Sequence, residues 1–172
     1  VRVVSAALVP DRCRRSELVV RLGTVRAVVS ICDCMNYLES KDDLLAVFKL
    51  VENYLEYRGA FIFDMITIHR YKDIMGDNTF AENREDCSFI WENSYDEKTG
   101  VNQYDLTLYI LNGEMYDRLE EQHIQHAFSV EDVVELLKEA KLEDIEVIDE
   151  ATGDVVTENT ERAVFIARKR GK

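Results

Sequence analysis

The strongest constraint on the fold is a pair of short apolar segments joined by a segment of helical length. Residues 27–32 and 60–63 are almost uninterrupted apolar runs. Between them, apolar residues from Lys41 to Tyr57 recur at the spacing of one helix face, and Arg58-Gly59 offers a helix end. Two strands covered on both faces and connected by a helix form a parallel β-α-β unit, so the sequence predicts an α/β fold.

Polar side chains stand directly after both predicted strands. Asp33, Asn36 and Tyr37 follow the first strand, and Asp64 follows the second. Ligands of open α/β sheets bind at the carboxyl ends of the strands, so these residues are the first candidates for a binding site. The alternative is structural: Asp33 and Asn36 cap the next helix, Tyr37 packs on the sheet and Asp64 begins a turn.

The middle of the chain has the pattern of an antiparallel sheet. Three extended segments, residues 88–95, 102–111 and 115–128, are separated by turn formers, of which Asn112-Gly113 is the clearest hairpin signal. We predict a meander of about three strands that covers one edge of the α/β unit or its strand ends. Its aromatic residues are expected in a core rather than in a substrate cage: Trp91, Tyr95, Tyr104 and Tyr109.

The last part of the chain returns to the α/β pattern. Ser129 caps a helix predicted to end near Lys141, and apolar strands are predicted over residues 145–148 and 163–167. The predicted domain organisation is an α/β domain of two segments that flank an antiparallel β insertion: residues 27–77 and 128–172, with the insertion over 78–127.

Residues 1–26 differ in composition from the rest. They contain six arginines, no lysine and two acids, which gives a local charge of 6 - 2 = +4, against -13 for the whole chain. Three explanations are open: a basic arm, a strand pair with arginine-rich turns, or a sequence that did not evolve with the remainder. This segment is therefore left unassigned.

The net charge limits the kinds of binding partner, and the cysteine content indicates the cellular compartment. A net charge of -13 lacks the clustered cations that bind nucleic-acid phosphates or an anionic membrane, so a small-molecule or protein partner is expected. Apolar runs fall short of the roughly 20 residues that span a bilayer, and the first residues lack the pattern of a secretory signal. Four cysteines without a regular framework, with Cys32 and Cys34 at a buried strand end, favour reduced thiols in the cytoplasm.

The sequence lacks the motifs of several classes of enzyme and of metal sites. The seven glycines form no Gly-x-Gly and no phosphate loop, which argues against a self-contained dinucleotide or P-loop enzyme. His123 and His126 lie on a predicted strand, where an offset of three puts them on opposite faces, so solvated side chains are expected and no metal site. No serine or cysteine pairs credibly with a histidine. No catalytic residue is assigned.

Longer motifs resemble a known family. They are Val28-Val29-Ser30-Ile31-Cys32-Asp33-Cys34-Met35-Asn36-Tyr37-Leu38, Tyr57-Arg58-Gly59-Ala60-Phe61-Ile62-Phe63-Asp64, Gly76-Asp77-Asn78-Thr79-Phe80, Phe89-Ile90-Trp91-Glu92 and Thr157-Glu158-x-x-Glu161-Arg162. Together they resemble the carboxyl-terminal two-thirds of small bacterial class I S-adenosylmethionine-dependent methyltransferases that carry a β-rich insertion after the fifth strand.

The resemblance implies a fold, a cofactor and a site. Residues 27–32 and 60–63 would be strands four and five of a partial Rossmann-like methyltransferase sheet, and the last two strands its sixth and seventh, an antiparallel hairpin at one edge. The cofactor would be S-adenosylmethionine, with Cys32, Asp33, Asn36 and Tyr37 beside it and Asp64 with His69 on the acceptor side. The family's glycine-rich loop has no counterpart here, so a truncated chain with weak or no activity is expected.

Two other classes of function stay open. One is a non-catalytic interaction module, in which an exposed sheet edge pairs with another chain, including a second copy. The other is a degenerate nucleotide-binding fold that uses Asp33 and Asp64 differently. If the chain is a methyltransferase, its acceptor is an unidentified small molecule or protein.

Overall fold

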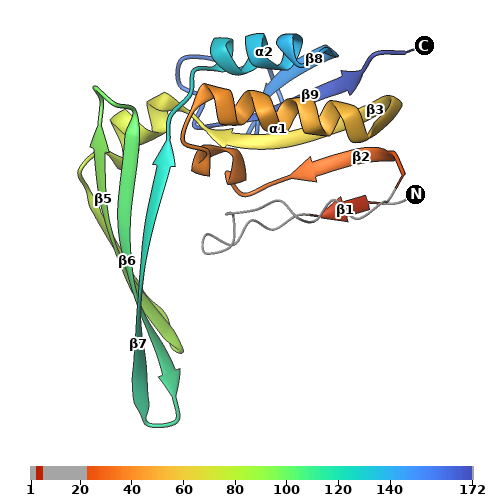
Figure 1. The fold of residues 1–172 in the computed structure, drawn as a ribbon. Coiled ribbons are helices and arrows are strands. Elements are labelled where there is room, and N and C mark those ends of the chain that lie inside the picture. The colour runs from red at the N-terminus through yellow and green to blue at the C-terminus, as the bar shows by residue number, and fades with distance from the viewer. Residues whose placement is uncertain (1–2, 6–22, 172) are drawn as a thin grey trace.

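The computed structural model describes residues 3–5 and 23–171, which form two sheets (Figure 1). Sheet A has the strand order β1-β2-β3-β9-β8. Its first three strands run parallel, β9 is antiparallel to β3, and β8 is antiparallel to β9. The strands are β1 (Val3–Ser5), β2 (Val25–Ser30), β3 (Leu55–Ile66), β8 (Leu142–Asp149) and β9 (Arg162–Lys169). The two predicted parallel strands are indeed neighbours, because Val28 stands opposite Phe61.

The crossover helix α1 (Lys41–Tyr54) ends earlier than its apolar pattern predicts. Its start is fixed by Ser40, whose side chain accepts a hydrogen bond from the backbone of Asp43. The chain enters β3 at Leu55, so Gly59 lies inside a strand and not after a helix. Arg58 takes the left-handed φ of 62°, and a Cβ on Gly59 would stand 2.8 Å from the carbonyl oxygen of Glu56. The glycine therefore permits a bulge where β3 meets β2.

Strand β2 also ends earlier than predicted, at Ser30 instead of Cys32. Cys32 and Asp33 have left-handed φ angles of 63° and 49°. This turn directs the chain across the end of sheet A into a short 3-10 helix, η2 (Cys34–Tyr37). The residues predicted at the strand end thus belong to a tight turn.

The core lies on one face of sheet A, under α1 and α2 (Val130–Glu139), which share that face (Figure 1). Phe48 of α1 packs against a row of stacked rings from the sheet, with centroids 4.6 Å apart for Phe61–Phe63 and 4.9 Å for Phe63–Phe165. Burying apolar rings is the largest favourable contribution to the stability of a domain of this size. This cluster therefore holds α1 and α2 on the sheet.

Sheet B is antiparallel with the strand order β4-β5-β6-β7. Its strands are β4 (Thr79–Asn83), β5 (Cys87–Asp96), β6 (Val101–Asn112) and β7 (Met115–His126). The predicted meander of about three strands thus has a fourth strand, β4, which follows the π-helix η3 (Arg70–Met75). All five residues of β4 are exposed, so β4 shows none of the alternation that marks a half-buried strand.

The two ends of sheet B differ in their surroundings. The near end packs against η2 and η3, where Ile66, Tyr71 and Met75 form a second core cluster with Trp91 and Tyr95. The far end of the β6–β7 hairpin extends well beyond the rest of the molecule (Figure 1). Residues 115–122 are exposed there. The fold is therefore α/β with an antiparallel insertion, and the insertion stands across the strand ends of sheet A.

Only part of the arginine-rich segment is described. Val3–Ser5 adds the strand β1 beside β2, and Arg26 pairs with Glu56 at 3.5 Å. The other positions that would decide among the three explanations for residues 1–26 lie outside the described residues. No helix within residues 3–5 and 23–171 combines the length and the apolarity that crossing a bilayer requires.

Candidate functional site

The carboxyl ends of β2 and β3 bring Asp33 and Asp64 together around one arginine. Arg162 at the start of β9 donates from Nη1 and from Nη2 to Oδ1 of Asp33, at 3.1 Å each. Its Nη1 also donates to Oδ2 of Asp64. The backbone N–H of Asp33 donates to the same Asp64 oxygen at 3.2 Å. The left-handed turn after β2 is what brings Asp33 within reach of both partners.

This ion-pair network is largely shielded from water. The side chains of Asp33, Asp64 and Arg162 are 17%, 8% and 22% exposed. Burial alone lowers the pKa of Arg162, but the hydrogen bond to Asp64 and the charge of Asp33 outweigh it and raise this pKa above its ordinary value. The guanidinium therefore stays charged and neutralises one of the two carboxylates.

A hydrogen-bond chain links this network to sheet B. Gln125 of β7 donates from Nε2 to Oδ2 of Asp33 at 2.5 Å, and its Oε1 accepts from the hydroxyl of Tyr71 at 3.1 Å. Gln125 and Tyr71 are both fully buried. Burial raises the pKa of Tyr71, and the charge of Asp33 adds to the effect, so Tyr71 is a neutral donor. The chain fixes Asp33 between the two sheets.

Tyr37 anchors a second polar cluster, where η2 meets sheet B. Its hydroxyl lies 3.2 Å from the hydroxyl of Tyr104 and 2.8 Å from Nδ1 of His123. The His123 ring stacks on Tyr104 with centroids 4.5 Å apart, and Trp91 covers the other side of Tyr104 at 4.4 Å. Burial raises the pKa of both tyrosines, so both hydroxyls are protonated at neutral pH.

His123 connects this cluster to the surface. Its Nε2 lies 3.2 Å from a carboxylate oxygen of Glu121, and its side chain is 15% exposed. The neutral ring with its proton on Nε2 satisfies both contacts, because Glu121 then accepts and Tyr37 donates. The prediction of a solvated side chain is wrong for His123, since Tyr37 and Tyr104 enclose it. Among the described residues, no group of three or more metal-ligand side chains is arranged to hold an ion.

Asn36 supports the site from beneath. It is fully buried, accepts from the backbone N–H of Ile66 at 2.9 Å, and donates to the carbonyl oxygens of Ile66 and His126. One side chain thus ties η2 to the end of β3 and the end of β7. Both N–H groups of its amide are therefore used, and neither remains to donate to a ligand.

The two cysteines of the turn differ in exposure. Cys34 is buried and its thiol contacts the carbonyl oxygen of Ile31 at 3.0 Å, whereas Cys32 is exposed. The prediction that both cysteines lie at a buried strand end therefore fits the burial of Cys34 and is wrong for Cys32. The left-handed turn is the reason, because it carries Cys32 out of the strand and onto the rim of the site.

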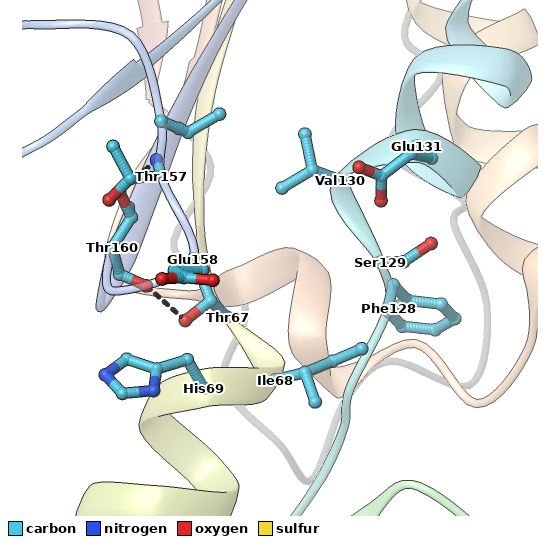
Figure 2. A pocket seen from close by; sticks show the side chains of 11 residues that line it. Thr67, Ile68, His69, Phe128, Ser129, Val130, Glu131, Thr157, Glu158 and Thr160 are labelled. Atoms are coloured by element: carbon cyan, nitrogen blue, oxygen red, sulfur yellow. Dashed lines mark hydrogen bonds between the residues drawn. The ribbon is translucent and has the colours of Figure 1, made fainter.

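A pocket of about 450 Å³ lies beside the ion-pair network. Asp33, Asp64 and Arg162 line it together with Glu150, and apolar side chains of sheet A form its walls. A second pocket of about 390 Å³ lies between the start of α2 and the loop before β9 (Figure 2).

The second pocket contains the other predicted acceptor-side residue, His69. Its Nδ1 lies 2.8 Å from Oδ2 of Asp73. Thr67 and Glu158 line the same side of the pocket as His69, and Glu131 lies across it (Figure 2). The side chains of Asp64 and His69, predicted to share a site, thus line different pockets. Asp33 and Asp64 do lie together, as the two strand ends predicted.

Several residues of the site were not predicted from the sequence. Arg162 was noted only as part of a motif, His123 was expected to be solvated, and Gln125 and Tyr71 were not singled out. Their partners lie far away in the chain: Arg162 meets Asp33 across 129 residues and Gln125 meets Asp33 across 92. The usable signals are that Arg162 immediately precedes an apolar strand and that Gln125 stands near the end of a predicted extended segment.

The fold and the site define a class of protein. Parallel β2 and β3, followed by the antiparallel edge pair β9 and β8, form the sheet that the resemblance to class I S-adenosylmethionine-dependent methyltransferases implies. A crystal structure of an S-adenosylmethionine-dependent methyltransferase from Clostridium acetobutylicum ATCC 824 matches with a TM-score of 0.81 and 27% identity. The match covers 87% of this chain and 60% of that one. In fold and in sequence the chain is similar to this methyltransferase.

Individual proteins also resemble the chain in sequence or in fold. A Bacillus subtilis (strain 168) protein named "Putative methyltransferase YqeM" is 35% identical over 149 residues, 86% of this chain and 60% of that protein. The CcbJ methyltransferase of Streptomyces caelestis shares the fold, with a TM-score of 0.72 and 11% identity over 86% of this chain and 61% of that one. No protein-family model matches. The chain spans about three fifths of the length of the curated relatives it matches.

Proposed function

We propose that this chain forms the acceptor side of an S-adenosylmethionine-dependent methyltransferase. The observation that carries the proposal is the meeting of Asp33, Tyr37 and Asp64 around the carboxyl ends of adjacent parallel strands, in a relative of methyltransferases. Open α/β sheets bind their ligands at this position. The methyl acceptor would be a small molecule or a protein.

The residues at the end of β2 fit the methyl-donor end of S-adenosylmethionine in part. Cys32 is exposed and Tyr37 is half-buried, so both offer a surface to a ligand. The carboxylate of Asp33 is held by Arg162 and Gln125, and the amide of Asn36 is held by backbone groups. In this proposal Asp33 and Asn36 support the cofactor surface from behind, while Cys32 and Tyr37 face it.

The chemistry supplied by S-adenosylmethionine, when bound, is an electrophilic methyl carbon on a positively charged sulfur. The residues of the chain would align the acceptor and receive its proton. When the His123 proton is on Nε2, Nδ1 accepts from the hydroxyl of Tyr37, so this hydroxyl can take a proton from an acceptor while passing its own to His123. Glu121 stabilises the imidazolium that results and leads to solvent.

The test is a titration of the labelled chain with S-adenosylhomocysteine, followed by amide NMR. We expect shifts at residues 32–37 with an affinity weaker than micromolar, because the sequence offers no Gly-x-Gly loop for the methionine moiety. ATP serves as the matched control for a generic nucleotide site. Unchanged residues 32–37, or equal shifts with ATP, would overturn the proposal. Micromolar affinity would overturn only its expectation of weak binding.

We place this activity in the cytoplasm. The described cysteines Cys32, Cys34 and Cys87 are all free thiols, and free thiols persist where the redox environment is reducing. Alkylation in denaturant at the moment of cell lysis checks this, since Cys32, Cys34 and Cys87 should then all be modified.

A further inference from the structure

We propose that a pocket of about 410 Å³ at the other end of sheet A binds a small phosphate ester whose organic part carries hydroxyl groups. The pocket is formed by the first part of β3, the start of β8 and the end of β9, at the end of the sheet that lies away from sheet B (Figure 1). It shares no lining residue with the pocket at Asp33 and Asp64. The inference is therefore independent of the proposed methyl transfer.

The lining of this pocket is rich in cations. It consists of four basic residues, two acids and one glycine: Arg58, Arg168, Lys169, Arg170, Glu143, Asp144 and Gly171. Two of the cations already have acidic partners at 3.4 Å, Arg170 in Glu143 and Lys169 in Glu52. Even when Glu52 is counted, the basic side chains outnumber the acidic ones by four to three.

The other two cations have no counter-charge. Within residues 3–5 and 23–171, the guanidinium groups of Arg58 and Arg168 take part in no ion pair and no hydrogen bond. The chain as a whole has a net charge of -13, so acidic partners are abundant. Two guanidinium groups that stay unpaired in one hollow of an acidic protein call for an anion.

The backbone is shaped to place residues at this pocket. Arg58 and Asp144 have left-handed φ angles of 62° and 49°, and each lies at an irregularity of its strand, in β3 against β2 and in β8 against β9. A bulge of this kind re-aims a side chain. Gly171 leaves room for Arg58, since a Cβ at position 171 would stand 3.4 Å from its Nε. Both irregular positions thus contribute to the same pocket.

The arrangement of the cations favours a phosphate. A guanidinium presents a planar fork of N–H donors that matches two oxygens of a phosphate or a carboxylate. Two forks in one pocket suit a phosphate monoester, which carries about -1.5 to -2 charges at neutral pH, better than a single carboxylate. Lys169 adds a fixed positive charge: it donates to the carbonyl oxygen of Glu52 at 2.7 Å and lies over the ring of Tyr57.

The remaining lining specifies the organic part of the ligand. Glu143 and Asp144 are exposed, and the described residues that line the pocket include no apolar side chain larger than glycine. Carboxylates repel a phosphate but accept hydrogen bonds from hydroxyl groups. The volume is many times the roughly 30 Å³ that one water molecule occupies, so a phosphate leaves room beside it. The pocket therefore fits a sugar phosphate, with its phosphate at Arg58 and Arg168 and its hydroxyls at the acids.

The test titrates the full chain with isotope-labelled arginine side chains, at a constant ionic strength of about 0.15 M. The probes are ribose 5-phosphate, inorganic phosphate and ribose. We expect ribose 5-phosphate to shift the Nε–Hε signals of Arg58 and Arg168 with a dissociation constant of about 1 mM, and inorganic phosphate to bind about threefold more weakly. Ribose should leave these signals unchanged. Inorganic phosphate that binds as tightly as the ester overturns the hydroxylated ligand, and no saturable shift with either phosphate overturns the site.

Three variants and a control make the result specific. Arg58→Gln and Arg168→Gln should each weaken ribose 5-phosphate about tenfold, and Arg58→Lys, which keeps the charge but loses the fork, about threefold. Arg84→Gln is the matched control, because it removes the same charge from sheet B and should change nothing. Both arginines of the pocket are exposed, so urea denaturation should show unchanged folding. An equal loss in Arg84→Gln, or unchanged binding in both glutamine variants of the pocket, contradicts the proposal.

Discussion

Two aromatic clusters stabilise this molecule, and they are built differently. Under α1 and α2 the rings are all phenylalanine, fully buried and stacked on one another. Where sheet B meets η2 and η3 the rings carry polar atoms that have hydrogen-bond partners, as in Tyr37 with His123 and Tyr71 with Gln125. The first cluster contributes packing alone. The second positions donors and acceptors at the strand ends.

The difference separates stability from chemistry. A phenylalanine core gains free energy from the apolar area it removes from water. A polar aromatic cluster gains little net free energy from each hydrogen bond but loses much when one partner is left unpaired, so it tolerates only one arrangement. Substitutions in the first cluster should change the free energy of unfolding most, and those in the second should change function at a smaller cost in stability.

Phe63→Ala should give the largest effect. Phe63 is fully buried and contacts Phe48, Phe61 and Phe165, so its loss leaves a cavity in the centre of the core. We expect the free energy of unfolding to fall by about 4 kcal/mol, measured by urea denaturation. The control is Phe80→Ala in sheet B, where the side chain is 37% exposed and the loss should be about 1 kcal/mol. Equal losses would contradict the distinction.

Arg162→Met should come next. The substitution leaves Asp33 and Asp64 as two neighbouring carboxylates with no counter-charge, and their repulsion should cost about 3 kcal/mol at neutral pH. The exposed pair Arg84–Glu82 is the control, and Arg84→Met should cost under about 0.5 kcal/mol. A loss for Arg162→Met no larger than that for Arg84→Met would be evidence against the repulsion.

Tyr37→Phe should have a smaller effect on stability and a larger one on function. The change removes a hydroxyl that contacts both Tyr104 and His123, which should cost about 1 kcal/mol. Under the proposed function it should also remove most methyl transfer in a protein that binds the cofactor. Tyr116→Phe, at a position that is 52% exposed, is the matched control for both measurements. Unchanged transfer in Tyr37→Phe would remove Tyr37 from the proton path.

The smallest effect should come from alkaline pH. Burial raises the pKa of Tyr37, Tyr71 and Tyr104 in the folded protein, whereas an unfolded tyrosine ionises near pH 10. Stability is therefore complete below that pH and is lost as the pH rises towards the folded pKa values. We expect a loss of roughly 0.5 kcal/mol at pH about 9.5. Tyrosinate absorbance checks this, since these three should ionise after the exposed tyrosines such as Tyr116.

The parallel β-α-β unit could be predicted because each of its sequence signals lies within a short stretch of residues. The apolar runs of β2 and β3, the helical spacing of α1 and the capping Ser40 each act within a few residues. The helix end was misplaced because Arg58-Gly59 has the composition of a helix terminus, whereas its left-handed backbone serves a bulge. β4 was missed because a strand exposed along its whole length leaves no periodic trace.

The site was predicted only to the extent that it follows from topology. Adjacent parallel strands end at one edge of a sheet, so Asp33 and Asp64 had to lie near each other. The antiparallel return of β9 then brings Arg162 between them, and the packing of β7 on η2 brings Gln125 and His123. These contacts depend on how the two sheets are placed relative to one another. No short stretch of the sequence determines that placement.

The stacking of Trp91 on Tyr104 has a practical consequence. Trp91 is the only tryptophan of the chain, so all of its indole fluorescence originates one ring away from the Tyr37–His123 contact. Emission intensity is sensitive to a neighbouring imidazole and to its protonation. Indole emission therefore reports on the junction of the two sheets without any added label.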